Sequence, residues 1–426
     1  MRAGRLRGGL VLSYPTNGLA SPFEDVASPS TAVVPLQQDQ GGACAPKVKK
    51  NDDVLVGQMI GESQNLHGAS IHAPISGKVT EIIKTFQSIS GQTVPAVVIE
   101  SDGQAQWIDN PAESDPLVAL QLAGIVDYDR QTIPLADKLE QARTRNVNSL
   151  IVNALDIEPI LSSRGRLLQE QPAKIATGID AIKKILNVTQ VFITVDENAF
   201  QSVSSIQSAL GGSTHILPLC NKYPQAVDYM LVKYVTHVEI PCADGVCIPD
   251  VGAVVVDVES LAAVGRKKPV VERFLTVTNS KGHVKNIRVT IGTPIRTVLD
   301  HCGITPDKGG KILAGGPMSG MAVASPDLPV TKDLVGIHVQ SQREVVAPAD
   351  ATCIKCGLCV EVCPMRLMPF MISGFSEKGM YAEAQHYDIS ACIECGCCEY
   401  LCPVKIPMVQ FIKFGKKQIS DQRSGA

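Results

Sequence analysis

The sequence predicts a multidomain protein of mixed α/β and α+β class, and three observations support this prediction. The chain has 426 residues, 45% of them hydrophobic, so it can bury more than one core of the usual domain size of roughly 100 to 200 residues. Short β-branched runs and helix-length segments occupy different parts of the chain. Nine of the fourteen cysteines fall within residues 353–402. We therefore expect several β-rich and α/β units followed by a separate cysteine-rich module.

Charge and hydropathy argue against two classes of function. The formal net charge is −3, with acidic and basic residues in balance, so we expect no nucleic-acid partner. The most apolar runs, such as 251–258, are far shorter than the roughly 18 to 20 residues that cross a bilayer. The apolar run 10–12 after the first arginines is too short for the core of a signal peptide. These patterns predict a protein of the reducing, cytosolic side.

The N-terminal third is expected to be β-rich. Residues 1–30 are rich in Gly, Ser and Pro, and we interpret them as an extended arm. Residues 31–104 are predicted to form a small all-β unit with strands at 31–36, 54–57, 71–72, 78–84 and 96–100. This unit resembles the barrel-sandwich hybrid fold of biotinyl and lipoyl domains. Those carriers hold a lysine on an exposed hairpin, whereas residues 61–76 contain none, so we expect no swinging arm here.

Residues 115–265 are predicted to form a Rossmann-like α/β domain. Helix-length segments at 133–145 and 172–186 alternate with apolar runs at 149–152, 190–195 and 253–258. Such alternation favours a mostly parallel sheet covered by helices.

Residues 268–340 return to β-rich patterns and predict a smaller α+β unit. Strands are expected at 274–278 and 286–289, and a helix at 294–301. A helical module is then predicted over residues 348–417, where the cysteines gather.

Two copies of one cysteine motif give this helical module its chemistry. Each copy reads Cys-x-x-Cys-x-x-Cys-x-x-x-Cys-Pro. In such repeats three thiolates hold one iron–sulfur cubane, and the fourth, beside the proline, ligates the other cluster. The crossed arrangement assigns Cys353, Cys356, Cys359 and Cys402 to a first [4Fe–4S] cluster, and Cys392, Cys395, Cys398 and Cys363 to a second. The sequence thus predicts a relay of single electrons without bond chemistry.

The remaining cysteines leave alternatives to consider. Four thiolates also suit tetrahedral zinc, but the crossed, proline-ended double repeat favours iron–sulfur clusters. Cys397 lies out of register between two ligands, and we interpret it as a bystander thiol. Five further cysteines lack the spacing for a third cluster: Cys44, Cys220, Cys242, Cys247 and Cys302. Cys242 and Cys247 could share a metal, although buried structural thiols are commoner.

The whole chain resembles the RnfC family, the peripheral component of the Rnf ion-translocating electron transport complex. The resemblance covers about residues 8 to 417 and rests on domain order and on local sequences: Gly8-Gly-Leu10, His72-Ala-Pro-Ile-Ser-Gly-Lys78, Glu158-Pro159, Lys222-Tyr-Pro-Gln225, Ile291-Gly-Thr-Pro294, Gly315-Gly-Pro-Met318 and Pro329-Val-Thr-Lys332. It implies a barrel-sandwich hybrid domain, an α/β domain similar to the flavoprotein subunit of respiratory complex I, a soluble-ligand-binding β-grasp (SLBB) unit and a dicluster ferredoxin-type module.

The chain departs from this family at its flavin site. The glycine-rich loop that holds FMN phosphate and NADH in the family reads here Tyr128-Asp-Arg-Gln-Thr-Ile-Pro-Leu-Ala-Asp-Lys138, and only Pro134 and Lys138 match. Asp129 brings a carboxylate to the phosphate position, and Arg130 and Thr132 fill space that glycines leave open. Two further flavin-site stretches are altered, at 153–159 and 226–230. We therefore expect this chain to bind neither FMN nor NADH.

The resemblance implies a peripheral iron–sulfur subunit on the cytoplasmic side of the cell membrane, held by other subunits of a membrane redox complex. Electrons would pass from a soluble donor, with ferredoxin as the candidate, through two [4Fe–4S] clusters to membrane redox subunits. Complexes of methanogenic archaea that use a cytochrome or quinone-like carrier in place of NAD would fit the altered flavin site. Attachment through a basic tail is one interpretation of Lys405, Lys413, Lys416 and Lys417, and a solvated helix face is the other.

Two rival functions stay open at this point. One is a flavin-dependent NADH:acceptor reductase similar to the cobalamin reductases, which the altered glycine loop disfavours. The other is a mainly structural subunit whose clusters stabilise the fold without turnover.

Overall fold

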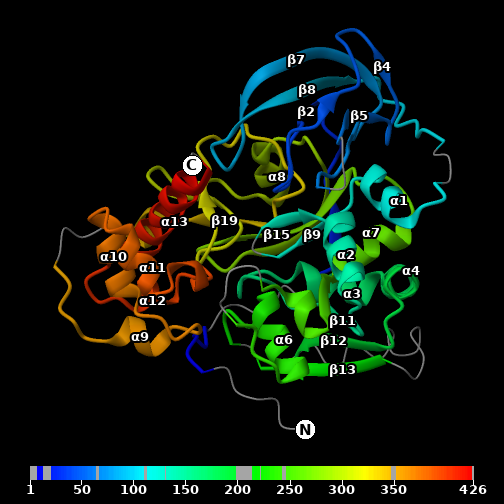
Figure 1. Cartoon of the computed structure of the whole chain (residues 1–426). Helices are drawn as coiled ribbons and strands as arrows, with labels where there is room; N and C mark the ends of the chain where they lie inside the picture. The colour runs from blue at the N-terminus through cyan, green and yellow to red at the C-terminus, as the bar shows by residue number, and fades with distance from the viewer. Residues whose placement is uncertain are drawn as a thin grey trace.

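The structure is a computed structural model that describes residues 7–12, 21–63, 67–109, 113–129, 131–197, 214–220, 222–241, 246–346 and 352–424. Three β-containing units and one helical module pack together, with the N-terminal β unit at the top of Figure 1 and the helical module beside the α/β domain. This multidomain architecture confirms the predicted fold class. Among the described residues, no helix is both long enough and apolar enough to cross a bilayer.

The N-terminal unit consists of two small antiparallel sheets. One sheet has the order β2-β8-β7-β4, with strands Thr31–Pro35, Thr93–Ser101, Gly77–Gln87 and Asp53–Val54. The other has the order β3-β5-β6, with strands Ala45–Pro46, Met59–Glu62 and Ile71–His72. Alternate residues such as Ala32, Val34, Val97 and Ile99 point into a shared core, as the period of two in a strand requires.

The α/β domain contains a four-stranded parallel sheet in the order β13-β12-β11-β14. Its strands are Thr214–Leu219, Gln190–Asp196, Ser149–Asn153 and Ala253–Asp257. Successive residues of β11 enter opposite cores: Leu150 joins the helices on one face, and Ile151 joins the core on the other face. Both faces are therefore covered, which explains why every residue of β11 is buried.

Helices and a short hairpin complete this domain. The hairpin pairs β9 (Val126–Tyr128) with β10 (Thr132–Pro134), and helix α2 follows directly. The helical segments are α1 Pro116–Leu122, α2 Leu135–Thr144, α3 Ser163–Glu170, α4 Pro172–Leu186, α6 Asp228–Thr236, η3 Ile248–Val251 and α7 Val258–Arg266. The predicted helix at 133–145 thus begins two residues later, because Ile133 and Pro134 belong to the hairpin.

The third unit is a six-stranded mixed sheet in the order β1-β16-β15-β19-β17-β18. Its strands are Phe23–Asp25, Val284–Thr290, Glu272–Asn279, Gly336–Gln340, Lys311–Ala314 and Met321–Ala322. Helix α8 (Ile295–Cys302) packs its buried face against this sheet, and the 3-10 turn η4 (Gln342–Glu344) follows β19. Strand β1 comes from the predicted N-terminal arm and pairs in parallel with β16, so that part of the arm belongs to the sheet.

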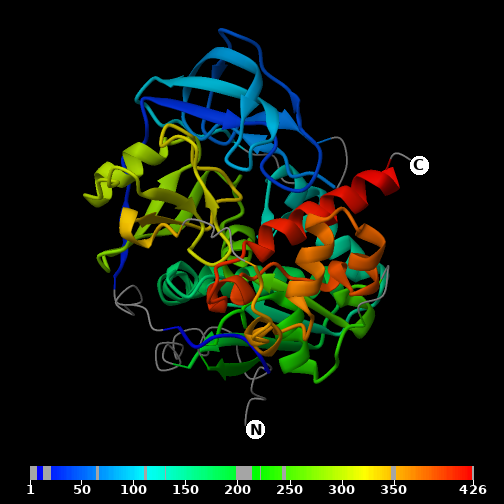
Figure 2. The ribbon, with the colours of Figure 1, turned by 90° about the vertical axis from the view of Figure 1, so that its left-hand side faces the viewer.

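The helical module, which we call the cluster module, spans residues 352–424. Its segments are α9 Leu358–Val362, α10 Pro369–Glu377, α11 Tyr381–His386, η5 Ile389–Ala391, α12 Cys397–Leu401 and α13 Met408–Ser424. A small core of Leu367, Ile372, Ala384, Ile389 and Ile412 joins these helices. The last helix, α13, lies along the outside of the module (Figure 2).

Candidate metal centre

The two cysteine repeats adopt the same backbone conformation. Gly357 and Gly396, which immediately precede α9 and α12, have φ angles of 81° and 79°. Lys355 and Glu394, two residues earlier, have φ angles of 56° and 55°. These left-handed conformations are uncommon outside glycine and recur at equivalent positions of the repeats. The repeats therefore fold as two equivalent ligand loops.

The structure brings the second predicted ligand set together. Cys392, Cys395 and Cys398 from the second repeat line one small pocket with Cys363 from the first repeat. Apolar side chains that include Leu367, Pro369 and Ile372 complete the lining of this pocket, which we call the second-set pocket. Its four thiols come from positions about 30 residues apart along the chain, as the crossed arrangement predicts.

The first predicted set lies nearer the surface. The Cys359 thiol is close enough to Cys353 and Cys356 for all three to interact electrostatically. Cys402 joins Cys359 in a small apolar cluster with Met408. Cys356 is exposed, whereas Cys359 and Cys402 are buried. Among the described residues, no three His, Cys, Asp or Glu side chains come close enough to hold a single metal ion.

The surroundings of the second-set pocket suit a metal-bound thiolate. Burial, and secondarily the neighbouring thiols, raises the pKa of the Cys363 thiol to about 11. The pKa of Cys398 is raised for the same reasons. Such thiols ionise when a metal cluster supplies positive charge. Backbone N–H groups already face two sulfurs, since Leu367 donates to Cys363 Sγ and Glu394 donates to Cys392 Sγ, each at 3.4 Å. The donor set therefore fits a [4Fe–4S] cluster.

Residues from the N-terminal arm and the α/β domain cover the second-set pocket. The Gly9 N–H donates to the Val362 carbonyl at 2.7 Å, and Leu10 pairs with Tyr223 as an isolated β-bridge. The Tyr223 hydroxyl donates to the Cys395 carbonyl at 2.6 Å. Leu10, Tyr223 and Val362 then form one apolar cluster with Cys395. Water is thereby kept from this side of the pocket.

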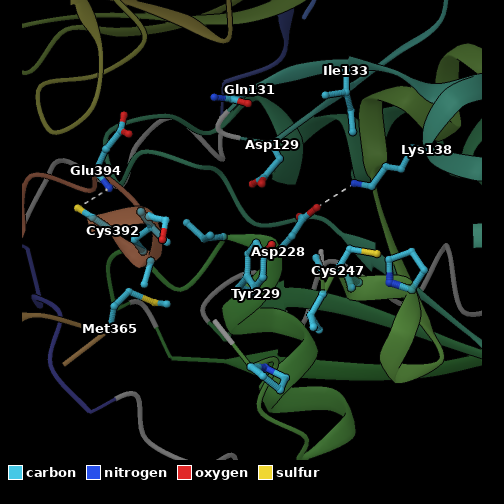
Figure 3. Close-up of a pocket in the computed structure, with 18 of the residues that line it drawn as sticks. Asp129, Gln131, Ile133, Lys138, Asp228, Tyr229, Cys247, Met365, Cys392 and Glu394 are labelled. Atoms are coloured by element: carbon cyan, nitrogen blue, oxygen red, sulfur yellow. Dashed lines mark hydrogen bonds and ion pairs between the residues drawn. The ribbon is translucent and has the colours of Figure 1, made fainter. Parts of the chain in front are cut away.

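A cleft of about 590 Å³ separates the α/β domain from the cluster module, and we call it the interdomain cleft. One wall carries Asp129, Lys138 and Asp228, and the other carries Cys392 and Glu394 from the cluster module (Figure 3). The cleft therefore places a ligand of the second predicted cluster opposite the altered flavin loop. The sequence pattern did not reveal Asp228 or Glu394 as site residues, because both lie far along the chain from the flavin loop.

The stretch that matches the flavin loop forms the β9–β10 hairpin and the start of α2. Tyr128 is buried, with its ring under the Arg273 guanidinium at 3.8 Å. Thr132 is buried in β10 and lies outside the interdomain cleft. Thr132 therefore does not fill ligand space, in contrast to the expectation from the sequence. Arg130 lies outside the described residues. Pro134 is the residue before the first turn of α2.

Two carboxylates neutralise the ammonium of Lys138. Its Nζ lies 2.6 Å from Asp127 Oδ2 and 2.8 Å from Asp228 Oδ2, and all three side chains are almost fully buried. Burial alone would lower the pKa of Lys138, but the adjacent carboxylates outweigh it and raise the pKa. Burial and the nearby Asp129 raise the pKa of Asp228 to about 7. Lys138 matches the family at the sequence level, yet in the fold it serves as the counter-ion of two aspartates.

The other altered flavin-site stretch makes contacts within the protein. The Glu158 carboxylate accepts hydrogen bonds from the Ser319 N–H at 2.7 Å and the Met318 N–H at 3.2 Å. The Asn153 amide donates to the Ala226 carbonyl at 2.8 Å. Both side chains are buried. These residues join the α/β domain to its neighbours and do not line the interdomain cleft.

The cysteines outside the two motifs fall into distinct environments. Cys44 and Cys302 are buried, and burial raises the pKa of each to about 11. The Cys247 thiol donates to Asp250 Oδ2 at 3.2 Å. Cys242, its suggested metal partner, lies outside the described residues. Cys397 is fully buried in the second-set pocket.

Comparison with known proteins gives three family matches along the chain. Residues 5–104 match the RnfC barrel sandwich hybrid domain, residues 120–266 match the Nuo51 FMN-binding domain, and residues 352–406 match the 4Fe-4S dicluster domain. The order of these matches agrees with the order of the folded units.

Curated relatives, all RnfC subunits, match over nearly the whole chain. The one from the proton-translocating ferredoxin:NAD(+) oxidoreductase complex of Clostridium ljungdahlii is 34% identical, covering 93% of this chain and 90% of the relative. The one from the ion-translocating oxidoreductase complex of Rhodobacter capsulatus is 34% identical, with coverages of 94% and 80%. The one from the Na(+)-translocating ferredoxin:NAD(+) oxidoreductase complex of Acetobacterium woodii is 32% identical, with coverages of 99% and 99%.

Proposed function

Because this chain belongs to the RnfC family of ion-translocating oxidoreductase complexes, we propose that it relays single electrons through two [4Fe–4S] clusters as a peripheral subunit. The electrons pass between a soluble donor such as ferredoxin and the membrane redox subunits of the complex. The chain alone acts as a relay, and the complex is the enzyme.

The observation that carries this proposal is the second-set pocket. Four thiols from two separate repeats meet there, and the repeats share one backbone conformation. We assign Cys392, Cys395, Cys398 and Cys363 to the second cluster, and by the equivalence of the repeats Cys353, Cys356, Cys359 and Cys402 to the first. A bound cubane supplies a centre that gains or loses one electron.

The protein residues hold and insulate these centres. The N–H groups of Leu367 and Glu394 face the ligand sulfurs and stabilise negative charge there. The cover of Leu10, Tyr223 and Val362 keeps water from the second cluster. The exposed Cys356 places the first cluster at the surface, where a protein partner can approach it. The chain is thus arranged to pass electrons between its surface and its interior.

We further propose that the interdomain cleft binds neither FMN nor NADH. A bound phosphate needs free N–H donors or an unpaired cation. The ammonium of Lys138 is already neutralised by Asp127 and Asp228, and Asp129 adds a further carboxylate to the wall. This arrangement repels anions. The same argument disfavours the rival function of a flavin-dependent NADH:acceptor reductase.

Attachment to the membrane complex is proposed to be peripheral, on the cytoplasmic side, through interactions with other subunits. The basic residues of the C-terminal segment contribute less than their number implies, because Lys413 and Lys416 both pair with Glu394. Lys405 donates to the Tyr400 carbonyl at 3.0 Å but its side chain stays exposed.

Metal and sulfide analysis of anaerobically purified protein tests the cluster assignment. We expect about eight iron and about eight acid-labile sulfide per chain, since two cubanes each hold four of both. About four iron per chain, or zinc in place of iron, would refute the dicluster assignment. Reduction of both clusters by ferredoxin in the assembled complex distinguishes a relay from a mainly structural subunit.

Flavin analysis of the same preparation tests the cleft. We expect no stoichiometric FMN and no bleaching of the clusters by NADH, whereas dithionite should bleach them. Bound FMN, or cluster reduction by NADH in the isolated chain, would show that the interdomain cleft still works as a flavin site.

A further inference from the structure

The two cysteine repeats differ at one position that the ligand pattern does not use. The first repeat reads Cys353-Ile-Lys-Cys-Gly-Leu-Cys359, and the second reads Cys392-Ile-Glu-Cys-Gly-Cys-Cys398. Leu358 and Cys397 therefore occupy equivalent positions, each as the first residue of a short helix. Leu358 is 38% exposed, whereas Cys397 is 0% exposed. One backbone position thus carries an apolar surface residue in one repeat and a buried thiol in the other.

The Cys397 side chain lies among the ligands of the second cluster. It lines the second-set pocket together with Cys363, Cys392, Cys395 and Cys398. Its thiol hydrogen-bonds to the sulfur of Cys395 as the donor, so the pocket contains a fifth sulfur in contact with a ligand. Four thiolates complete a cubane, which leaves this fifth thiol protonated.

The surroundings of this contact are dry and fixed. Cys395 and Cys397 share one apolar cluster with Tyr223 and Val362, and Leu10 packs against it. The Tyr223 hydroxyl holds the Cys395 carbonyl at 2.6 Å, which fixes the backbone that carries the ligand. A hydrogen bond is electrostatically stronger in such a low-dielectric site than in water.

On the basis of the proposed electron relay, we propose that Cys397 is a positioning residue that tunes the second cluster: its S–H donates to Cys395 Sγ and raises the reduction potential of this cluster relative to the first. Hydrogen bonds to ligand sulfurs are one of the determinants of cluster potential, because they stabilise the additional negative charge of the reduced state. Leu358 cannot donate such a bond to the first cluster. The two centres therefore differ in potential for a reason encoded at one position, and the second is the more easily reduced.

A redox titration of the full chain, monitored by electron paramagnetic resonance, tests this proposal. Three variants are compared with the unchanged protein: Cys397→Ala removes the donor, Cys397→Ser keeps a donor of similar size, and Leu358→Ala is the matched change in the first repeat. The signal of the second cluster is identified as the one lost in Cys392→Ala.

We expect Cys397→Ala to retain about eight iron per chain and to lower the midpoint potential of the second cluster alone. Cys397→Ser should restore most of the potential, and Leu358→Ala should leave both potentials unchanged. An unaltered second-cluster potential in Cys397→Ala would overturn the proposal. Loss of iron from Cys397→Ala would also overturn it, because Cys397 would then be needed to hold the cluster. If the unchanged protein lacks two clusters, the proposed function fails instead.

Discussion

The α/β domain and the cluster module both bury polar groups, but they compensate for them in different ways. In the α/β domain buried cations meet carboxylates of the same chain, as Lys138 does with Asp127 and Arg273 does with Glu259 at 2.8 Å. In the cluster module the buried thiols Cys363 and Cys398 face mainly other thiols. The first region is therefore complete as a protein, whereas the second depends on a metal cofactor.

This difference has a functional meaning. A site that neutralises its own cation has none left for a phosphate, so the interdomain cleft is a scaffold between domains. A site with uncompensated thiols gains free energy when it binds iron, so the cluster module keeps the chemistry. Substitutions, acid and salt should therefore act differently on the two regions.

Removal of one crossed ligand should abolish one cluster, which is the largest expected effect. Cys363→Ala is expected to lose about half of the iron, since a cubane needs its four thiolates. Because Cys363 lies with the second set, the double variant Cys363→Ala/Cys392→Ala should lose no more iron than Cys363→Ala alone. The double variant Cys363→Ala/Cys353→Ala should lose both clusters. Iron analysis checks this, and the reverse pattern would contradict the crossed assignment.

Removal of the Lys138 charge should destabilise the protein without altering iron content. Lys138→Met leaves Asp127 and Asp228 buried without their counter-ion, which typically costs about 3 to 5 kcal/mol. The matched control is Lys47→Met, because Lys47 pairs with Glu62 at 2.7 Å on the surface, where such pairs contribute about 0 to 1 kcal/mol. The measurement is urea unfolding of the anaerobic protein. Equal midpoints for the two variants would show that Lys138 is not the internal counter-ion.

Acidification should destabilise the scaffold through His72, a buried residue of the N-terminal unit. Burial, and secondarily the charge of Lys332, lowers the pKa of His72 to about 3, compared with an ordinary value of 6.5. The unfolded chain therefore binds more protons than the folded chain between these values. The contribution of His72 to stability should be fully present above the ordinary pKa of 6.5 and should fall as the pH decreases, by at most about 1.4 kcal/mol per pH unit.

His72→Gln is expected to reduce this slope. The measurement is urea unfolding at several values between about pH 5 and 6.5, within which the iron content is followed as a control for acid loss of clusters. An unchanged slope in His72→Gln would assign the acid sensitivity to other groups.

The smallest expected effect concerns attachment to the complex. If protein contacts hold the chain, high salt or a mild chaotrope should release it from membranes without detergent, since salt screens charged contacts. Lys417→Gln should change the salt midpoint only slightly, because single exposed charges contribute little. A strict requirement for detergent would show an anchor that these contacts do not explain.

Much of the fold could be predicted from the sequence because its signals are local. The helix at 172–186 matches α4 in full, and the strand at 190–195 differs from β12 by one residue. Both segments carry strong periodicity and are bounded by turn residues. The β9–β10 hairpin was not predicted, because its strands have three residues each and too short a pattern to detect.

The sequence by itself determined the cysteine register, the order of the domains and the loss of glycines from the flavin loop, since each is a matter of residue type and spacing. Only the tertiary structure decided what Lys138 and Cys397 do. Lys138 kept its place in the motif, but its partner Asp228 lies 90 residues away along the chain. Cys397 is a bystander by spacing, yet packing of Tyr223 and Leu10 buries it beside a ligand. Burial and counter-ions depend on residues that approach only in the fold, so local patterns could not reveal these roles.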